Sequence, residues 1–280
     1  MSDRPGSETR TQITTYDNGA PSERSDRVAT EEPLEIRISI AGESRTIAIT
    51  MRTPGADFEL AVGFLFGEGV IERREQIVGI SYCRDDNLPE DQLYNIVIVE
   101  LDPSTRPDLR PLERHFFTSS ACGGCGKASL DALELRGIPA VSTGPILDPG
   151  TIGSLPDRLR AGQGVFDSTG GLHAAGLFDP AGHVVAVRED VGRHNAVDKL
   201  IGWAFLEDRL PISTGTVMVS GRTSYEIVQK CLAAGVPIVC SVSAPSSLAV
   251  DVAKRFGMTL VGFVRGPRFN VYAGAERVKA

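Results

Sequence analysis

The chain has 280 residues, 41% hydrophobic and 23% charged, so it can bury the core of one large domain or two modest ones. Its formal net charge of -7 argues against a protein that wraps nucleic acid, which normally carries a basic excess. No apolar run approaches the roughly 18 to 20 residues of a membrane span, and the N-terminus lacks the apolar core of a secretory signal. We expect a soluble, cytoplasmic protein that binds neither nucleic acid nor membrane.

Residues 1–30 are rich in Ser, Thr, Arg, Asp, Glu and Gly and hold almost no large apolar side chains. Such a composition buries too little apolar surface to offset the entropy lost on ordering. We therefore expect a disordered tail over 1–30.

Residues 31–115 are predicted to form a β-rich N-terminal domain. Alternating apolar and polar residues from Leu34 onward predict two strands joined at Gly42, and the stretch from Pro54 to Gly69 predicts a helix. A further strand pair is expected in GISYCRDD and LYNIVIVEL.

Residues 131–280 are predicted to form an α/β domain, because strand-like and helix-like segments alternate there. The expected strands are GHVVAVRED, GTVMVSG, PIVCSVS and TLVGFVRG, and the expected helices are HNAVDKLIGWAFLED, SYEIVQKCLAAG and SLAVDVAKRFG. This order is typical of a layered sheet with helical crossovers.

The five cysteines are too few and too unevenly spaced for a disulfide framework. Cys83, Cys231 and Cys240 stand alone, whereas Cys122 and Cys125 form one C-x-x-C. A reducing compartment suits this usage.

The C-x-x-C lies in SSACGGCGK, where glycines leave the sulfurs unscreened by bulky neighbours. Neighbouring hydroxyls, backbone N–H groups and Lys127 favour the thiolate, which is the nucleophile that attacks a donor persulfide. We expect residues 116–130 to be a mobile loop between the two domains, suited to a carrier that visits a donor and then an acceptor.

Other interpretations of the cysteine pair stay open on spacing alone. Half of a structural zinc site would need two more ligands, and no second C-x-x-C or C-x-x-H accompanies this one. A thioredoxin-like redox pair normally caps a helix directly after a strand, and Gly123-Gly124 loosens that geometry. A buried, unreactive pair is the third alternative.

Three turns each follow an expected strand and open an expected helix: 190–195, 219–224 and 243–247. Free N–H groups, hydroxyls and the Arg222 guanidinium would suit a phosphate in the second turn, although a plain helix cap is the simpler interpretation. If the turns share one end of the sheet, they form a crevice. Ser220, Gly221 and Arg222 are therefore secondary candidates for an anion site.

The last expected strand ends in two arginines and two aromatic residues, within FVRGPRFN. This combination suits a nucleobase with a diphosphate, and an ordinary solvated edge is the alternative. His173 lies among small residues with no Asp or Glu beside it, so it has no local support as a metal ligand or an acid–base residue.

Six segments, taken together and in order, resemble the formate dehydrogenase accessory sulfurtransferase family, FdhD/NarQ. The likeness runs from about Leu34 to Val278, and its segments are SSACGGCGK, TGGLHAAGLF, REDVGRHNAVDKLIG, SGRTSYEIVQK, SVSAPSSLAVDVAKRFGMTLVGFVRG and FNVY.

The resemblance implies a sulfurtransferase of the persulfide-carrier type. It would take sulfur from a cysteine desulfurase and pass it to Mo-bis(molybdopterin guanine dinucleotide) before this cofactor enters the catalytic subunit of formate dehydrogenase. It implies a persulfide on Cys122, assistance from Cys125 and a homodimer. The family's cofactor-binding stretch falls on Phe263, Val264, Arg265, Gly266, Pro267 and Arg268.

The resemblance also implies a cytidine-deaminase-like fold for the larger domain. His173-Ala174-Ala175 stands where deaminases carry His-x-Glu, and the segment ending at Cys240 has no Pro-Cys-x-x-Cys. Zinc therefore lacks a ligand set here, and we expect no metal site. A zinc deaminase is thus disfavoured, while a non-catalytic chaperone of the molybdenum cofactor is the main alternative to a sulfurtransferase.

Overall fold

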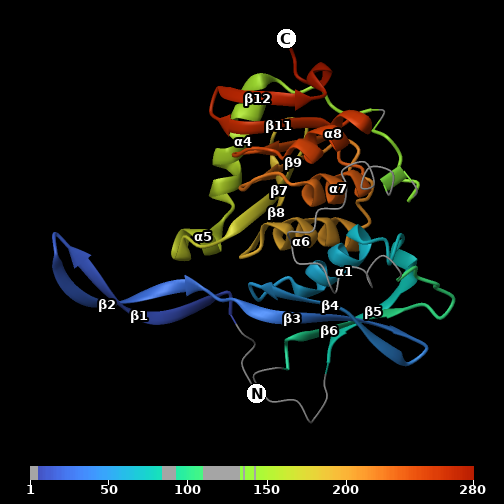
Figure 1. Cartoon of the computed structure of the whole chain (residues 1–280), viewed down its shortest axis with the longest axis horizontal. Coiled ribbons are helices and arrows are strands. Elements are labelled where there is room, and N and C mark those ends of the chain that lie inside the picture. Colours follow the sequence, from blue (N-terminus) through green and yellow to red (C-terminus); the bar gives the residue numbers. More distant parts are fainter. Residues whose placement is uncertain (1–5, 84–92, 110–132, 135, 142) are drawn as a thin grey trace.

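The structure is a computed structural model that describes residues 6–83, 93–109, 133–134, 136–141 and 143–280. It contains a two-stranded hairpin, a four-stranded sheet and a six-stranded sheet within these ranges (Figure 1).

Residues 8–29 form a hairpin and correct the expectation of a disordered tail over 1–30. Strands β1 (Glu8–Asp17) and β2 (Ala20–Ala29) pair antiparallel along their full length. Asn18 and Gly19 both adopt positive φ at the turn, which is the conformation that an Asn-Gly hairpin turn requires. Composition indicates only how much apolar surface a segment can bury. This hairpin is instead held by hydrogen bonds between its two strands, and it extends away from the two larger sheets (Figure 1).

The N-terminal sheet has the strand order β4-β3-β6-β5. Its strands are β3 (Glu32–Ile40), β4 (Glu43–Arg52), β5 (Ile77–Tyr82) and β6 (Ile96–Leu101), with helix α1 (Asp57–Gly67) and the short helix η1 (Arg74–Gln76) between β4 and β5. Leu34, Ile36 and Ile38 alternate along β3 and are buried with Leu60 and Leu65 of α1. The β-rich N-terminal unit is therefore a sheet with α1 on one face.

The larger sheet has the order β12-β11-β10-β9-β7-β8. Strands β9, β10 and β11 run parallel, β7 runs antiparallel to both β8 and β9, and β12 returns antiparallel to β11. The bounds of the strands are β7 (His173–Phe178), β8 (Val184–Asp190), β9 (Thr216–Val219), β10 (Ile238–Ser241), β11 (Thr259–Arg265) and β12 (Arg268–Ala273).

Helices cover both faces of this sheet (Figure 1). Side chains of one face pack on α6 (Arg193–Leu206), α7 (Tyr225–Ala233) and α8 (Ser247–Arg255). Those of the opposite face pack on α4 (Pro149–Ala161), which is followed by α5 (Gly164–Thr169), and the chain ends after η4 (Ala275–Arg277). The layered α/β domain with a smaller β-rich N-terminal unit is confirmed.

The sequence patterns did not predict α4, α5, β7 and β12. Pro156 lies inside α4, and a proline within a segment normally argues against a helix. Strand β7 consists of HAAGLF, whose small residues carry little strand signal. Packing on the sheet, rather than local propensity, stabilises these elements.

Helices α1 and α6 join the two units through paired glycines. A Cβ on Gly63 would lie 1.8 Å from the Asp198 carbonyl oxygen, and one on Gly202 would lie 1.8 Å from the Glu59 carbonyl oxygen. Neither position has room for a side chain, so the two helix backbones approach closely and the N-terminal unit is held against the α/β domain.

Candidate functional site

The candidate site lies along one edge of the larger sheet, where β8, β9, β10 and β11 all end. Because these strands are parallel to one another, the turns that follow them meet at that edge, which fulfils the condition under which they form a crevice. Two of the turns are joined directly. The Thr223 N–H donates to the Ala244 carbonyl (3.2 Å), and the Ser246 N–H donates to the Thr223 carbonyl (2.9 Å).

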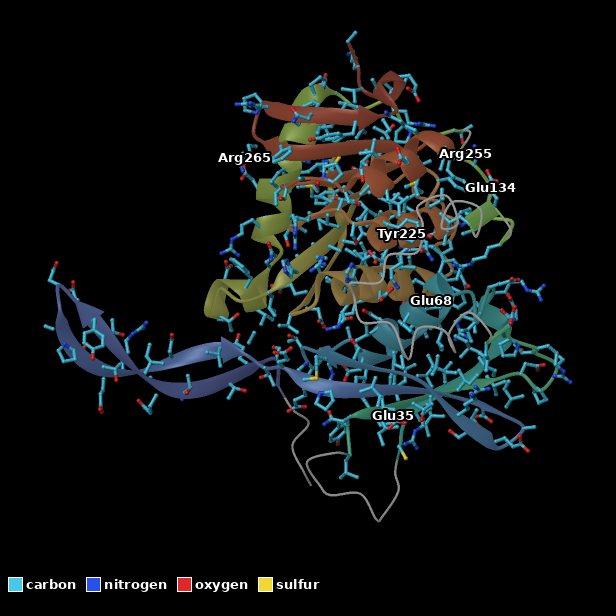
Figure 2. The ribbon with its side chains drawn as sticks, viewed as in Figure 1. Glu35, Glu68, Glu134, Tyr225, Arg255 and Arg265 are labelled. Carbon is cyan, nitrogen blue, oxygen red and sulfur yellow. The ribbon has the colours of Figure 1, made fainter. Side chains whose placement is uncertain are left out.

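The stretch from Phe263 to Arg268 forms the end of β11, the following turn and the start of β12. Arg265 and Arg268 face each other across this turn, and both are exposed; Figure 2 shows Arg265 at this end of the sheet. A cavity of about 240 Å³ is lined by Phe263, both arginines and Asn270. Among the described residues no carboxylate belongs to this lining, and the two arginines make its described part cationic.

The backbone around this cavity is held from two sides. Phe263 adopts φ 54°, and its N–H donates to the Ser243 carbonyl at 3.1 Å. Gly266 packs on α4 so closely that a Cβ on Gly153 would lie 2.3 Å from its carbonyl oxygen. Positive φ at a non-glycine residue is uncommon and marks Phe263 as a constrained position.

The turn at Ser220, Gly221 and Arg222 is tied to β7. The Ser220 N–H donates to the Ala174 carbonyl (2.9 Å), and the Ala174 N–H donates to Ser220 Oγ (2.8 Å). Gly221 lies against the His173 ring, since a Cβ there would be 3.3 Å from Nδ1. Ser220 and His173 line a second cavity of about 580 Å³, whose lining does not include Arg222.

His173 begins β7 at the same edge and is half-buried. Burial lowers the pKa of its ring, and the positive charge of Arg193 lowers it further. The ring is therefore neutral near pH 7. Within the described ranges, no group of three or more His, Cys, Asp or Glu side chains is placed to hold a metal ion; Cys122 and Cys125 lie outside these ranges, so the absence of zinc stays a prediction.

The residues expected to carry sulfur, Cys122 and Cys125, fall within 110–132 and lie outside the described residues, as does the expected loop 116–130. The described chain on either side reaches both cores: Leu109 packs on the core of the N-terminal unit and Leu133 is buried in that of the α/β domain. Glu134, next to Leu133, pairs with Arg255 of α8 at 2.6 Å (Figure 2). The cysteine segment therefore runs between residues anchored in the two units.

Two of the three remaining cysteines are poorly suited to nucleophilic chemistry. Cys231 and Cys240 are fully buried in the α/β domain, and burial raises the pKa of each thiol to about 12. Cys83, just after β5, is partly exposed. A carrier cysteine needs the thiolate form and access to a donor, which the two buried thiols lack.

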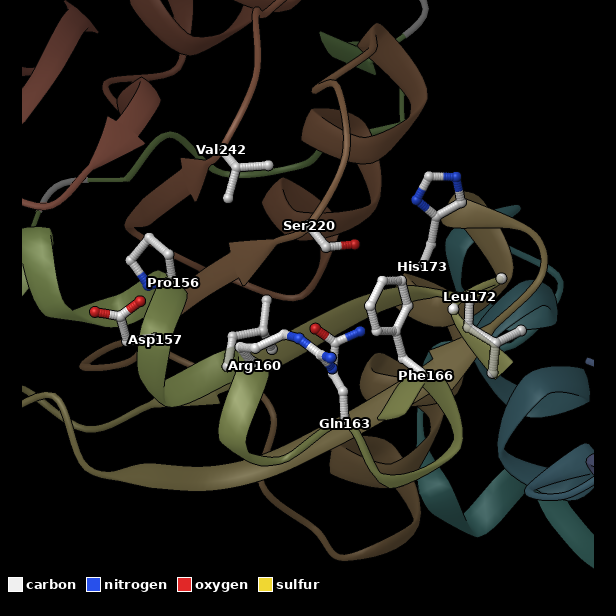
Figure 3. Close-up of a pocket in the computed structure, with 12 residues that line it drawn as sticks. Pro156, Asp157, Arg160, Gln163, Phe166, Leu172, His173, Ser220 and Val242 are labelled. Atoms are coloured by element: carbon white, nitrogen blue, oxygen red, sulfur yellow. The ribbon is translucent and has the colours of Figure 1, made fainter. Parts of the chain in front are cut away.

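A part of the site was missed by sequence reasoning. Arg160 belongs to α4, Gln163 to the bend after it and Phe166 to α5. All three line the cavity beside Ser220 and His173 (Figure 3). Because neither helix was predicted, no sequence signal placed these residues near the sheet edge.

Comparison with known proteins decides the family. The model of the FdhD/NarQ family matches residues 29–279. The chain belongs to this family. A protein of Streptomyces coelicolor named sulfur carrier protein FdhD is 53% identical over 264 residues, which cover 93% of this chain and 92% of that protein. A protein of the same name from Mycobacterium tuberculosis is 48% identical over 263 residues, covering 91% and 92%.

The family likeness extends to three dimensions. The crystal structure of a protein from Desulfotalea psychrophila, described as a formate dehydrogenase accessory protein, superposes with a TM-score of 0.74 at 28% identity. The match covers 97% of this chain and 99% of that one. In the described part of this chain, no helix is long and apolar enough to cross a membrane.

Proposed function

We propose that this member of the FdhD/NarQ family is a cytoplasmic sulfur carrier that serves a formate dehydrogenase. The observation that carries the proposal is the near-complete match to relatives named as sulfur carriers, in a chain that contains one C-x-x-C. The burial of Cys231 and Cys240 supports it, because it removes these two thiols from the candidates for the carrier.

The proposed first step is thiol–persulfide exchange at Cys122. Its thiolate attacks the terminal sulfur of a persulfide on a cysteine desulfurase, a new S–S bond forms on Cys122, and the desulfurase cysteine leaves as a thiolate. In the second step the acceptor forms a bond to the terminal sulfur, the S–S bond breaks, and Cys122 leaves as a thiolate. We assign Cys125 an assisting role in release of the sulfur.

The proposed acceptor is Mo-bis(molybdopterin guanine dinucleotide), held as a substrate at the sheet edge. The cavity from Phe263 to Asn270 fits a nucleotide end of this molecule, because two arginines face it and a phenyl ring lies beside them. Guanidinium groups bind phosphate through paired hydrogen bonds, and aromatic rings stack on bases. The catalytic subunit of formate dehydrogenase would receive the sulfurated cofactor, and we propose a homodimer as the carrier's working form.

A non-catalytic cofactor chaperone is the second candidate. It is favoured by one observation: two arginines, a phenylalanine and an asparagine of the described chain already form a cavity suited to a nucleotide. A chaperone would bind the same acceptor but would carry no sulfur.

Intact mass spectrometry after incubation with a cysteine desulfurase and cysteine separates the two functions. We expect additions of about 32 Da that map to Cys122, with none in Cys122→Ala. Cells that carry only Cys122→Ala should lack formate dehydrogenase activity, while Cys125→Ala should be milder. Normal activity with Cys122→Ala would leave the chaperone as the function, and equal, complete loss in both variants would point to a shared metal or an obligatory two-thiol relay.

A further inference from the structure

The hairpin of β1 and β2 extends away from the two larger sheets (Figure 1). It forms a sheet of its own, so both of its outer edges are unpaired within the described part of the chain. Most of its side chains are exposed, and Tyr16 near the tip has 70% of its surface exposed. A two-stranded hairpin is only marginally stable by itself in water, and an unpaired strand edge can accept a further strand. The family model begins at residue 29, so the family match does not account for this element.

The base of the hairpin is fixed to α5. Ser168 Oγ donates to the Glu8 carboxylate, and Glu8 also pairs with Arg27 at 3.1 Å. Ala29 lies directly opposite Glu8, and a Cβ on Gly171 would lie 3.6 Å from the Cβ of Ala29. These contacts fix the direction in which the hairpin leaves the α/β domain, so its outer part is presented to another molecule.

The pairing of β1 with β2 decides which backbone groups of β2 point to its outer edge. The Thr30 N–H donates to the Ser7 carbonyl (3.0 Å), and hydrogen-bonded pairs alternate with non-bonded pairs along an antiparallel ladder. In the register of this hairpin, the N–H and carbonyl groups that point outward therefore belong to Pro21, Glu23, Ser25, Arg27 and Ala29. The position of Pro21 agrees, because proline has no N–H to donate to β1.

The charges along β2 are self-complementary in the antiparallel direction. Residues 23–27 read Glu-Arg-Ser-Asp-Arg. If two β2 strands pair about Ser25, Glu23 lies opposite Arg27 of the partner subunit, and Arg24 lies opposite Asp26 of the partner subunit. Side chains directly opposite each other are close enough to interact, and opposite charges stabilise such pairs. The two-fold axis repeats each pair.

The neighbouring registers are unfavourable. Pairing about Glu23, Arg24, Asp26 or Arg27 would place that residue opposite its own copy, and like charges directly opposite each other are destabilising. Ser25 is uncharged, and its N–H and carbonyl point to the outer edge, so the central pair can exchange hydrogen bonds. Charged residues usually discourage pairing at a strand edge. Here the charges match a second copy of β2 in one register.

We propose that the outer edge of β2 pairs antiparallel with β2 of a second copy of the chain about Ser25. The product is a continuous sheet with the order β1-β2-β2-β1, and a sheet of more than two strands is stable where a single hairpin is marginal. This β2 contact rests on the homodimer of the proposed function and names the strand that joins the copies. The tip of each hairpin would reach the base of the other, because Pro21 of the partner subunit lies opposite Ala29.

Prolines on the two edges of the hairpin test which strand makes the contact. Ser25→Pro removes the central outward N–H of β2. Gln12→Pro is the matched control, since Gln12 lies directly opposite Ser25 and its N–H points to the outer edge of β1. Sedimentation velocity of the full chain measures the Kd of the dimer. Ser25→Pro should raise this Kd about tenfold, because both hydrogen bonds of the central pair are lost, and Gln12→Pro should leave it unchanged.

Charge exchange tests the register. Arg24→Glu places two carboxylates opposite each other, and Asp26→Arg does the same with two guanidinium groups, so each should raise the Kd of the dimer about tenfold. The double variant Arg24→Glu/Asp26→Arg restores opposite charges and should dimerise as wild type does. A mixture of the two single variants should form mixed dimers, because each variant supplies the charge that the other needs.

A wild-type chain that stays monomeric overturns the β2 contact, as does a dimer whose Kd is unchanged by both Ser25→Pro and Arg24→Glu. Equal weakening by Gln12→Pro and Ser25→Pro also overturns it, since the effect would then belong to the hairpin as a whole. If circular dichroism shows that Ser25→Pro does not fold, the charge variants decide, and failure of the double variant to recover refutes the register.

The sulfur-carrier proposal is tested separately by the mass of Cys122 after exposure to the desulfurase. A dimer that survives all variants refutes the β2 contact and leaves the homodimer and the carrier standing. Dimers that respond as expected in a chain that accepts no sulfur on Cys122 would refute the carrier alone.

Discussion

Lys199 Nζ lies 2.7 Å from Asp190 Oδ2, and both side chains are almost fully buried. The pair also joins the two units of the chain through Thr53, which follows β4. The Lys199 ammonium donates to the Thr53 carbonyl (2.8 Å), and the Thr53 N–H donates to Asp190 Oδ2 (3.2 Å). Asp190 is the last residue of β8. The contact therefore also fixes the end of β8 at the sheet edge that forms the candidate site.

Lys199→Met should lower the free energy of unfolding by about 3 to 5 kcal/mol, because it leaves the Asp190 carboxylate buried without its charge partner. Urea denaturation followed by circular dichroism measures this change. Arg27→Met is the matched control, since it removes the exposed pair with Glu8 and should change stability by no more than about 0.5 kcal/mol. If both variants lose the same free energy of unfolding, the buried pair stabilises the fold no more than the exposed pair does.

Thiol reactivity should separate the cysteines by burial. At pH 8, Cys231 and Cys240 should resist iodoacetamide in the folded protein, because a pKa of about 12 leaves roughly one thiol in ten thousand ionised. Cys122 should be alkylated much faster. Peptide mass spectrometry with and without urea measures this, and unfolding should make all of these residues reactive. Rapid labelling of Cys240 in the native protein would contradict its burial.

Stability should fall as the pH drops from about 6.5 toward 4, in part because of His194. Burial, aided by the charge of Arg193, lowers the pKa of this ring to about 4, so in this range the unfolded chain binds the proton and the folded chain does not. His194 Nε2 lies 3.0 Å from Ser224 Oγ, and His194→Gln keeps a polar group there. The variant should show a smaller loss of stability than wild type between pH 6.5 and 4. An identical pH profile would refute the assignment.

Guanosine diphosphate should bind the arginine cavity as a stand-in for one end of the acceptor. Arg265→Ala or Arg268→Ala should weaken it roughly ten- to a hundred-fold, because a hydrogen bond to a charged phosphate contributes about 1.5 to 3 kcal/mol. Calorimetric titration measures the affinities, with circular dichroism as the check on folding. Cys122→Ala is the control and should bind as wild type does. If it alone loses binding, the cysteine segment forms part of the pocket.

The sequence alone predicted the strands and helices from β8 to β11, because apolar residues recur there at strand and helix spacing. It left open whether the turns at residues 190, 220 and 243 share one end of the sheet, and the strand order of the structure places them there. The resemblance, not the periodicity, pointed to the family, and the comparisons confirm it. The assignments of Cys122, Cys125 and the Phe263 to Arg268 stretch remain predictions.

Only the tertiary structure revealed the second cavity, because its residues belong to elements with weak local signals. Helix α4 contains Pro156, and Gln163 and Phe166 lie at the start of the short helix α5, whose first N–H groups donate to Glu189 of β8. The hairpin at residues 8–29 was missed for a related reason: backbone pairing and the Asn18-Gly19 turn close it, whereas composition reports apolar burial. Periodicity records which face of an element is buried, and it contains no information on contacts between elements distant in the chain.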